Sequence, residues 1–158
     1  MALWRLYYHL VWSTKDRQPL ITPAIEPILY GYMIGKAIWH GGIIHAIGGI
    51  ATHTHVVASI PPKDAIAEFV KNLKGSSAHH INHGPQRFDL TFGWQRGYGV
   101  FSLGAKQLPE AITYVRHQKE HHNHGNLLEM LERDDDADDG PVIWNAGEAI
   151  QGIRVIKP

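Results

Sequence analysis

The sequence predicts an α+β domain in which helices pack on an antiparallel sheet, and three features support this fold class. Its 158 residues suit one domain with a short appendage. The 44% hydrophobic content is ordinary for a chain that builds a core, and the absence of Cys excludes disulfides, thiolate zinc sites and a cysteine nucleophile. Strand and helix signals alternate as β-α-β-β-α-β-α, and the first six match the split βαβ order of a ferredoxin-like (RRM-like) fold.

The first half of the chain supplies the first four of these elements. Residues 5–12 are rich in Tyr, Leu, Val and Trp, which favours a strand. A helix follows over about 23–39, where Thr22 is suited to cap the N-terminus and Pro23 to occupy the first turn. Gly41-Gly42 ends this helix, and residues 43–49 and 55–60 have the composition of strands.

The second half supplies the other three elements. Asp64 is expected to cap a helix with apolar residues at helical spacing that reaches about His80. His83-Gly84-Pro85 breaks that helix, and residues 98–103 form the predicted fourth strand. Pro109 opens a last helix that we expect to run to about residue 123.

The charge is distributed unevenly although its sum is zero. Residues 1–128 contain 12 Lys and Arg against 7 Asp and Glu, a net charge of +5, and all 12 His. Residues 129–158 contain 3 Lys and Arg against 8 Asp and Glu, a net charge of −5. The run of Asp at 134–139 before Gly140-Pro141 favours a solvated linker, and its spacing does not suit a Ca²⁺ loop. The sequence therefore predicts a basic body over 1–128, then an acidic linker and apolar C-terminal tail over 129–158.

The first candidate site is the triplet His53-Thr54-His55. On a strand, residues two apart project from the same face, so both imidazoles would point together. Two imidazoles on one sheet face make half of a divalent-metal site. A pair of surface histidines in a His-rich chain is the alternative that this spacing alone leaves open.

The second candidate site lies on the last predicted helix. Tyr114 and Gln118 are four residues apart, which places them on one helical face, with His121 and His122 toward its flank. A helical tyrosine is commonly part of a core or an interface. Beside a cation or a bound metal, however, its phenol can act as a nucleophile. Gln118 could add an oxygen ligand of the kind that Mg²⁺ and Mn²⁺ accept.

Several motifs in order give the chain a resemblance to a known family. They span most of residues 5–123, and the Trp-Gln-Arg-Gly-Tyr-Gly segment at 94–99 is especially typical. The chain resembles the HUH single-tyrosine transposases, namely small insertion-sequence transposases and REP-associated tyrosine transposases. The motifs are Tyr8 to Lys15 with Arg17 to Ile21, His53 to Val57 with Ile60-Pro61-Pro62, Leu73 to Ser77, Trp94 to Ser102, and Tyr114-Val115-Arg116 with Gln118.

This resemblance implies a role for each candidate residue. His53, His55 and Gln118 would bind Mg²⁺ or Mn²⁺, and Tyr114 would attack a DNA phosphodiester to form a 5′-phosphotyrosine link. The 3′-OH released could rejoin strands without ATP, so no nucleotide cofactor is expected. Family members act as dimers on single-stranded DNA with hairpins at element ends. Two residues depart from the family pattern: Thr54 replaces a bulky apolar residue, and Thr52 replaces an Asn or Asp.

Basic and aromatic side chains would then contact the DNA. Basic residues neutralise phosphates, and aromatic rings stack on unpaired bases, worth ~1–3 kcal/mol per base. For Trp94 a place in the core is an alternative, and for the two helical lysines a solvated helix face. The predicted contacts are Lys15, Arg17, Lys71, Lys74, Arg87, Trp94, Arg96 and Tyr98.

Three functions follow from these observations. The leading interpretation is a metal-dependent transposase with residues 1–128 as its HUH domain. The others are a domesticated enzyme that nicks hairpin DNA, and a catalytically silent module that binds single-stranded DNA. No leader or membrane-spanning run is evident, because the apolar stretch at 43–50 is short and contains Gly48-Gly49, so a cytoplasmic location is expected.

Overall fold

In the computed structural model, the part of the chain that can be described runs from residue 2 to residue 120. It contains a four-stranded antiparallel sheet in the order β2-β3-β1-β4. This confirms the predicted α+β class and the ferredoxin-like order of elements. The predicted boundary at 128/129, the acidic linker, the apolar tail, His121 and His122 lie outside the described residues.

The elements follow the predicted order, with boundaries shifted by a few residues. Along the chain they are β1 (Tyr7–Ser13), the short 3-10 helix η1 (Lys15–Arg17), α1 (Glu26–Trp39), β2 (Ile43–Ile50), β3 (His53–Ser59), α2 (Ile66–His83), β4 (Gly99–Leu103) and α3 (Leu108–Arg116). None of the helices in residues 2–120 is long and apolar enough to cross a membrane.

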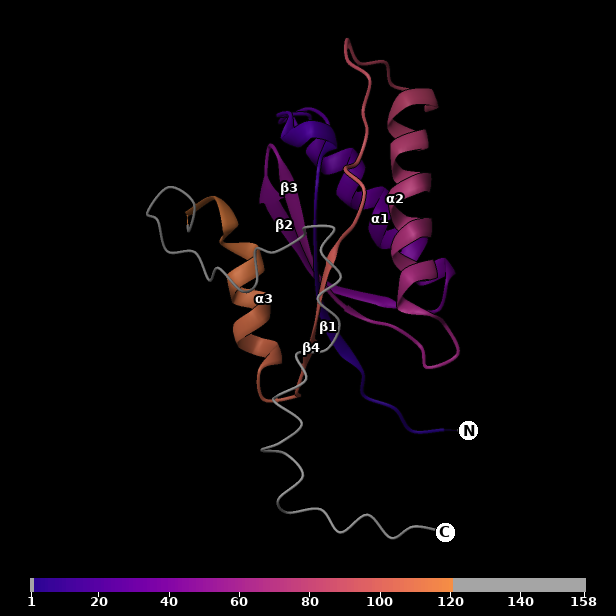
Figure 1. Ribbon diagram of the computed structural model, residues 1–158, viewed down its shortest axis with the longest axis vertical. Helices are drawn as coiled ribbons and strands as arrows, with labels where there is room; N and C mark the ends of the chain where they lie inside the picture. Colours follow the sequence, from indigo (N-terminus) through magenta and orange to yellow (C-terminus); the bar gives the residue numbers. More distant parts are fainter. Residues whose placement is uncertain (1, 121–158) are drawn as a thin grey trace, which may run out of the picture.

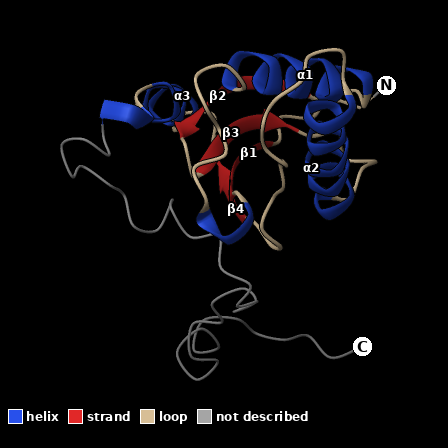
Figure 2. Cartoon of the chain, turned by 90° about the horizontal axis from the view of Figure 1, so that it is seen from above, coloured by secondary structure: helices blue, strands red, loops and turns tan. Residues whose placement is uncertain are grey.

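The sheet is covered on both faces, with α1 and α2 on one side and α3 on the other (Figures 1 and 2). Every residue of β3 is buried, because this central strand meets side chains from both layers. Its even-numbered residues Val56 and Ala58 join the larger core below α1 and α2, whereas Val57 packs against α3. Alternation along the strand therefore puts His53 and His55, which share the parity of Val57, on the face toward α3.

Two of the predicted helix starts are wrong for identifiable reasons. The first helix, α1, begins at Glu26 with Ile25 as its N-cap rather than after Thr22, because residues 23–25 form a turn. Asp64 does not cap α2: Ala65 is the N-cap, with no side-chain cap bond. The last helix is interrupted at His117, which has a non-helical backbone and an Nδ1 that lies 2.8 Å from the Thr113 carbonyl oxygen. Residues 118–120 are again helical, and the predicted end near residue 123 lies outside the described residues. At α1, the Gly41 prediction is confirmed, since Gly41 takes a φ of +79° at the helix end.

Gly48 allows α3 to lie directly on the sheet. A Cβ at this position would collide with the backbone carbonyl oxygen of Val115 in α3. In the sheet, Gly48 pairs with His55, so the point of closest approach between α3 and β2 is beside the second histidine. The lack of a side chain on β2 thus determines how near Tyr114 comes to the histidines.

Replacing Gly48 with Ala should therefore destabilise the protein. We expect Gly48→Ala to lower the free energy of unfolding by ~1–3 kcal/mol, because overpacking forces the backbone of α3 or β2 to move. Urea unfolding measures this change. Gly35→Ala is the matched control: the added methyl has nothing within 4 Å, so it should be neutral or stabilise by up to ~1 kcal/mol. Equal stability of both variants would contradict the close approach.

Candidate functional site

The two histidines of β3 are buried side by side on the sheet face toward α3. His53 is 5% exposed and His55 is fully buried. Their ring centroids lie 5.1 Å apart at an interplanar angle of 72°. The structure thus places both imidazoles on one face of a central strand, as the spacing predicted, and it removes the alternative of a surface pair.

Tyr114 faces this pair from α3. It is 6% exposed, and its ring centroid lies 6.0 Å from that of His55 in an edge-on contact. Ala111 and Val115, one turn apart on α3, belong to the same small core as Tyr114, together with Val57 of β3 and Ala46 of β2. The tyrosine therefore belongs to an apolar contact layer and adjoins the histidines at the same time.

Gln118 is buried just beyond the end of α3. It is 1% exposed, and neither its amide oxygen nor its amide nitrogen has a hydrogen-bond partner among the described residues. A buried polar group without a partner costs ~1–3 kcal/mol, so such a group commonly serves a ligand. No contact between Gln118 and the histidines is established.

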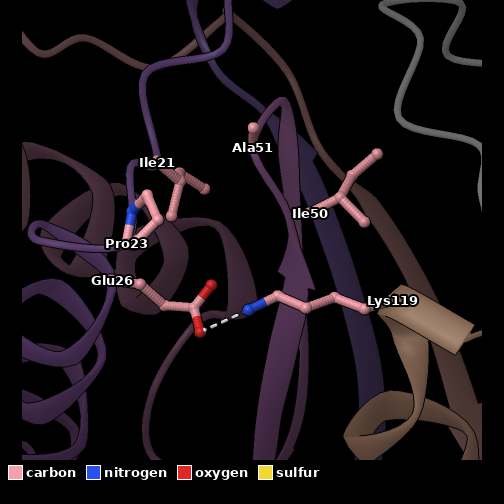
Figure 3. Close-up of a pocket in the computed structure, with 6 residues that line it drawn as sticks. All are labelled: Ile21, Pro23, Glu26, Ile50, Ala51 and Lys119. Carbon is pink, nitrogen blue, oxygen red and sulfur yellow. Dashed lines mark hydrogen bonds and ion pairs between the residues drawn. The ribbon is translucent and has the colours of Figure 1, made fainter.

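The residue after Gln118 is tied to the start of α1. Lys119 Nζ lies 2.9 Å from Glu26 Oε1 across an opening of about 330 Å³ with apolar walls from Ile21, Pro23, Ile50 and Ala51 (Figure 3). Lys119 is 63% exposed, so the pair contributes at most ~1 kcal/mol. The pair links the segment after α3 to the start of α1, beside the β2-β3 turn.

A third buried histidine, which the sequence did not single out, completes this cluster. His9 of β1 is 1% exposed, and its Nε2 lies 2.9 Å from Nδ1 of His55. Its ring stacks on His55 at 5.0 Å between centroids and meets Tyr114 edge-on at 6.2 Å. Strand alternation could have put His9 on the correct face, but only the pairing of β1 with β3 brings it to His55.

The two threonines that depart from the family pattern have local partners. Thr54 is fully buried on the opposite face, and its hydroxyl donates to the carbonyl oxygen of Gly48 at 3.2 Å. Thr52 Oγ1 lies 3.3 Å from Nδ1 of His53. The polar Thr54 is therefore satisfied within the β2-β3 hairpin, and Thr52 contacts the first histidine directly.

Most of the predicted DNA contacts gather elsewhere, around a groove between α2 and residues 94–98. The groove encloses about 470 Å³, and five of the eight predicted residues line it: Lys71, Lys74, Trp94, Arg96 and Tyr98. Lys74 Nζ spans the groove and donates to the carbonyl oxygen of Gln95 at 2.8 Å and to that of Gly97. Trp94 is half-buried and packs edge-on against Trp12, with its indole N–H donated to Ser77 Oγ at 3.0 Å.

Lys15 and Arg17 border this groove. Their turn bonds to its wall: the Lys15 N–H donates to the Gly93 carbonyl, and the Asp16 N–H to Gln95 Oε1, both at 2.9 Å. Arg87 is exposed after α2 and does not line the groove. Because Ser13 pairs with His53 and Thr14 bridges to Trp94, the groove border and the start of β3 lie at the same end of the sheet.

The fold and this cluster define a class of small α+β proteins in which a His-Xaa-His strand faces a tyrosine helix. Comparison with known proteins identifies the family. The family model described as "Transposase IS200 like" matches residues 2–118. The chain therefore belongs to the IS200-like transposase family, as the sequence motifs predicted.

Relatives and solved structures agree with this assignment. The ISDra2 transposase TnpA of Deinococcus radiodurans is 27% identical over 124 residues, covering 75% of this chain and 89% of the relative. The transposase for insertion sequence element IS200 of Salmonella typhimurium is 28% identical over 133 residues, covering 80% and 86%. A Deinococcus radiodurans R1 crystal structure superposes with a TM-score of 0.58 at 25% identity, covering 74% of this chain and 93% of that one.

A second solved structure has the same fold. The REP-associated tyrosine transposase bound to a REP hairpin matches with a TM-score of 0.57, covering 80% of this chain and 76% of that chain. At 14% identity, this match supports the fold alone.

Proposed function

We propose that this transposase cleaves and rejoins single-stranded DNA at hairpin-containing ends through a 5′-phosphotyrosine formed by Tyr114. The observation that carries the proposal is the burial of Tyr114 against the rings of His55 and His9, with His53 beside His55. A tyrosine that served only to fill the core would not require two imidazoles against its ring. The resemblance to HUH transposases supplies the reaction that suits this cluster.

The residues present fit a divalent cation. Within residues 2–120, no group of three or more His, Cys, Asp or Glu side chains could hold a metal, so the two imidazoles need an oxygen donor of another kind. The buried amide of Gln118 would supply one, and a mixed nitrogen and oxygen donor set suits Mg²⁺ or Mn²⁺. When bound, such a cation would polarise the phosphodiester and lower the barrier to attack.

The chemistry assigned to the chain is an exchange of phosphodiester bonds. The Tyr114 oxygen attacks phosphorus and loses its proton, a bond forms between them, and the bond from phosphorus to the 3′ oxygen breaks. The released oxygen takes up a proton and becomes a 3′-OH. The reverse step, with the 3′-OH of another strand, restores a DNA phosphodiester and frees the tyrosine. One ester bond replaces another in each step, so no nucleotide cofactor is needed.

The groove between α2 and residues 94–98 is the surface that we assign to DNA. Lys71, Lys74 and Arg96 surround the apolar ring of Tyr98, a combination that suits phosphates beside stacked bases. A hairpin held there would have its single-stranded flank near Lys15 and Arg17, at the end of the sheet where β3 begins.

We also propose a homodimer and a cytoplasmic location, as expected for an insertion-sequence enzyme that acts on chromosomal DNA.

Removing the Tyr114 hydroxyl should abolish covalent capture of DNA. Tyr114→Phe keeps the ring that packs against His55, so the fold should persist while the nucleophile is lost. The assay incubates a 3′-labelled oligonucleotide, taken from hairpin-forming DNA that flanks the gene, with Mn²⁺ and follows the adduct on a denaturing gel. Tyr32→Phe is the matched control, since Tyr32 stacks on His80 away from the site. An adduct with Tyr114→Phe, or hairpin binding by the native chain with no adduct under any metal, would contradict the proposal.

Neutralising the groove should weaken DNA binding in a salt-dependent way. The double variant Lys71→Gln, Arg96→Gln should reduce the slope of log affinity against log salt by about 1.4, from roughly 0.7 per phosphate contact on a single strand. Both residues are exposed on the groove rim, so folding should be unaffected. The double variant Lys36→Gln, Lys63→Gln removes the same charge elsewhere. Equal slopes for the two variants would show that net charge, rather than the groove, attracts the DNA.

A further inference from the structure

His9 and His55 form a buried contact that the proposed chemistry does not yet use. His9 lies on β1 opposite Val57, and His55 lies opposite Val11, so the two histidines are diagonal neighbours on the same sheet face. Nε2 of His9 is 2.9 Å from Nδ1 of His55, and both side chains are buried. A contact of this length between two ring nitrogens requires one to donate and the other to accept.

We propose that His9 is a positioning residue: it holds His55 in the tautomer and ring orientation in which Nε2, rather than Nδ1, is presented to the metal. This inference rests on the proposed function, because it concerns the metal site assigned above. A neutral imidazole that binds a cation through Nε2 carries its proton on Nδ1. The Nδ1–H of His55 then donates to Nε2 of His9, which carries its own proton on Nδ1. Histidine ligands are commonly fixed by such a second hydrogen bond.

The packing around His9 explains why it can fix a neighbour. Its ring is held between Phe101 of β4, at 6.1 Å between centroids, and Tyr114 of α3, at 6.2 Å. An acceptor held between two rings has little freedom to turn, so it constrains the imidazole to which it bonds. His53 has a different local partner, since its Nδ1 lies 3.3 Å from Thr52 Oγ1. In both histidines, then, it is Nδ1 that contacts a neighbouring polar group.

The test compares two replacements of His9 by Mn²⁺ binding without DNA, followed from the electron paramagnetic resonance signal of free Mn²⁺. His9→Phe keeps a ring of similar size but removes the acceptor, and we expect binding to weaken roughly 10- to 100-fold. His9→Gln places an amide oxygen near the position of Nε2 and should restore most of the affinity. His45→Phe is the matched control: His45 contacts Ser59 at 2.7 Å on the same sheet, and its loss should leave the affinity unchanged.

The outcomes separate this inference from the proposed function. Native protein whose Mn²⁺ affinity is absent, or is unchanged by His53→Ala, would overturn the metal site itself. Affinity that depends on His53 but is equal in His9→Phe and native protein would overturn the role of His9 alone.

A second measurement applies to the native chain and does not depend on the folding of a variant. Long-range ¹H–¹⁵N correlations distinguish the two neutral imidazole tautomers. The inference requires the proton of His55 on Nδ1 in the metal-free protein. A proton on Nε2 of His55 would overturn it.

Discussion

The close approach of α3 to the backbone of β2 at Gly48 determines most of what this chain can do. The Val115 carbonyl lies where any side chain at Gly48 would be, so at this position the helix contacts the backbone of β2 directly. Tyr114 and Val115 then share a small core with Val57, which lies two residues from His55 on the same face of β3. Tyr114 and two imidazoles can be buried together only because the helix is this close.

The sheet separates two surfaces with different properties. The face toward α3 is small, buried and rich in imidazole, whereas the groove beside α2 is open and basic. They meet at the end of the sheet where Ser13 pairs with His53 and the Lys15–Arg17 turn begins. A cluster that excludes water favours chemistry on a phosphodiester, and an open basic groove favours holding a polyanion. In the proposed function, the two tasks are therefore assigned to opposite layers of one small domain.

The sequence could predict the features that depend on local pattern. Hydrophobic alternation and turn residues were sufficient for the element order, and the spacing of His53 and His55 was sufficient for their common face. Features that depend on the pairing of distant segments could not be predicted from the sequence. The contact of His9 with His55 needs the register of β1 against β3, and the groove needs Lys74 to reach carbonyl groups more than 20 residues away. The break in the last helix at His117 was missed because this histidine contacts a carbonyl of its own helix, a local competition that propensity does not reveal.

The most direct test of this account is the crystal structure of the chain grown with Mn²⁺, with the ion located by its anomalous scattering. The account predicts one ion bound by Nε2 of His53, Nε2 of His55 and the amide oxygen of Gln118, beside Tyr114, with His9 still bonded to Nδ1 of His55. An ion bound through Nδ1 of His55, or one that leaves Gln118 without a partner, would contradict it.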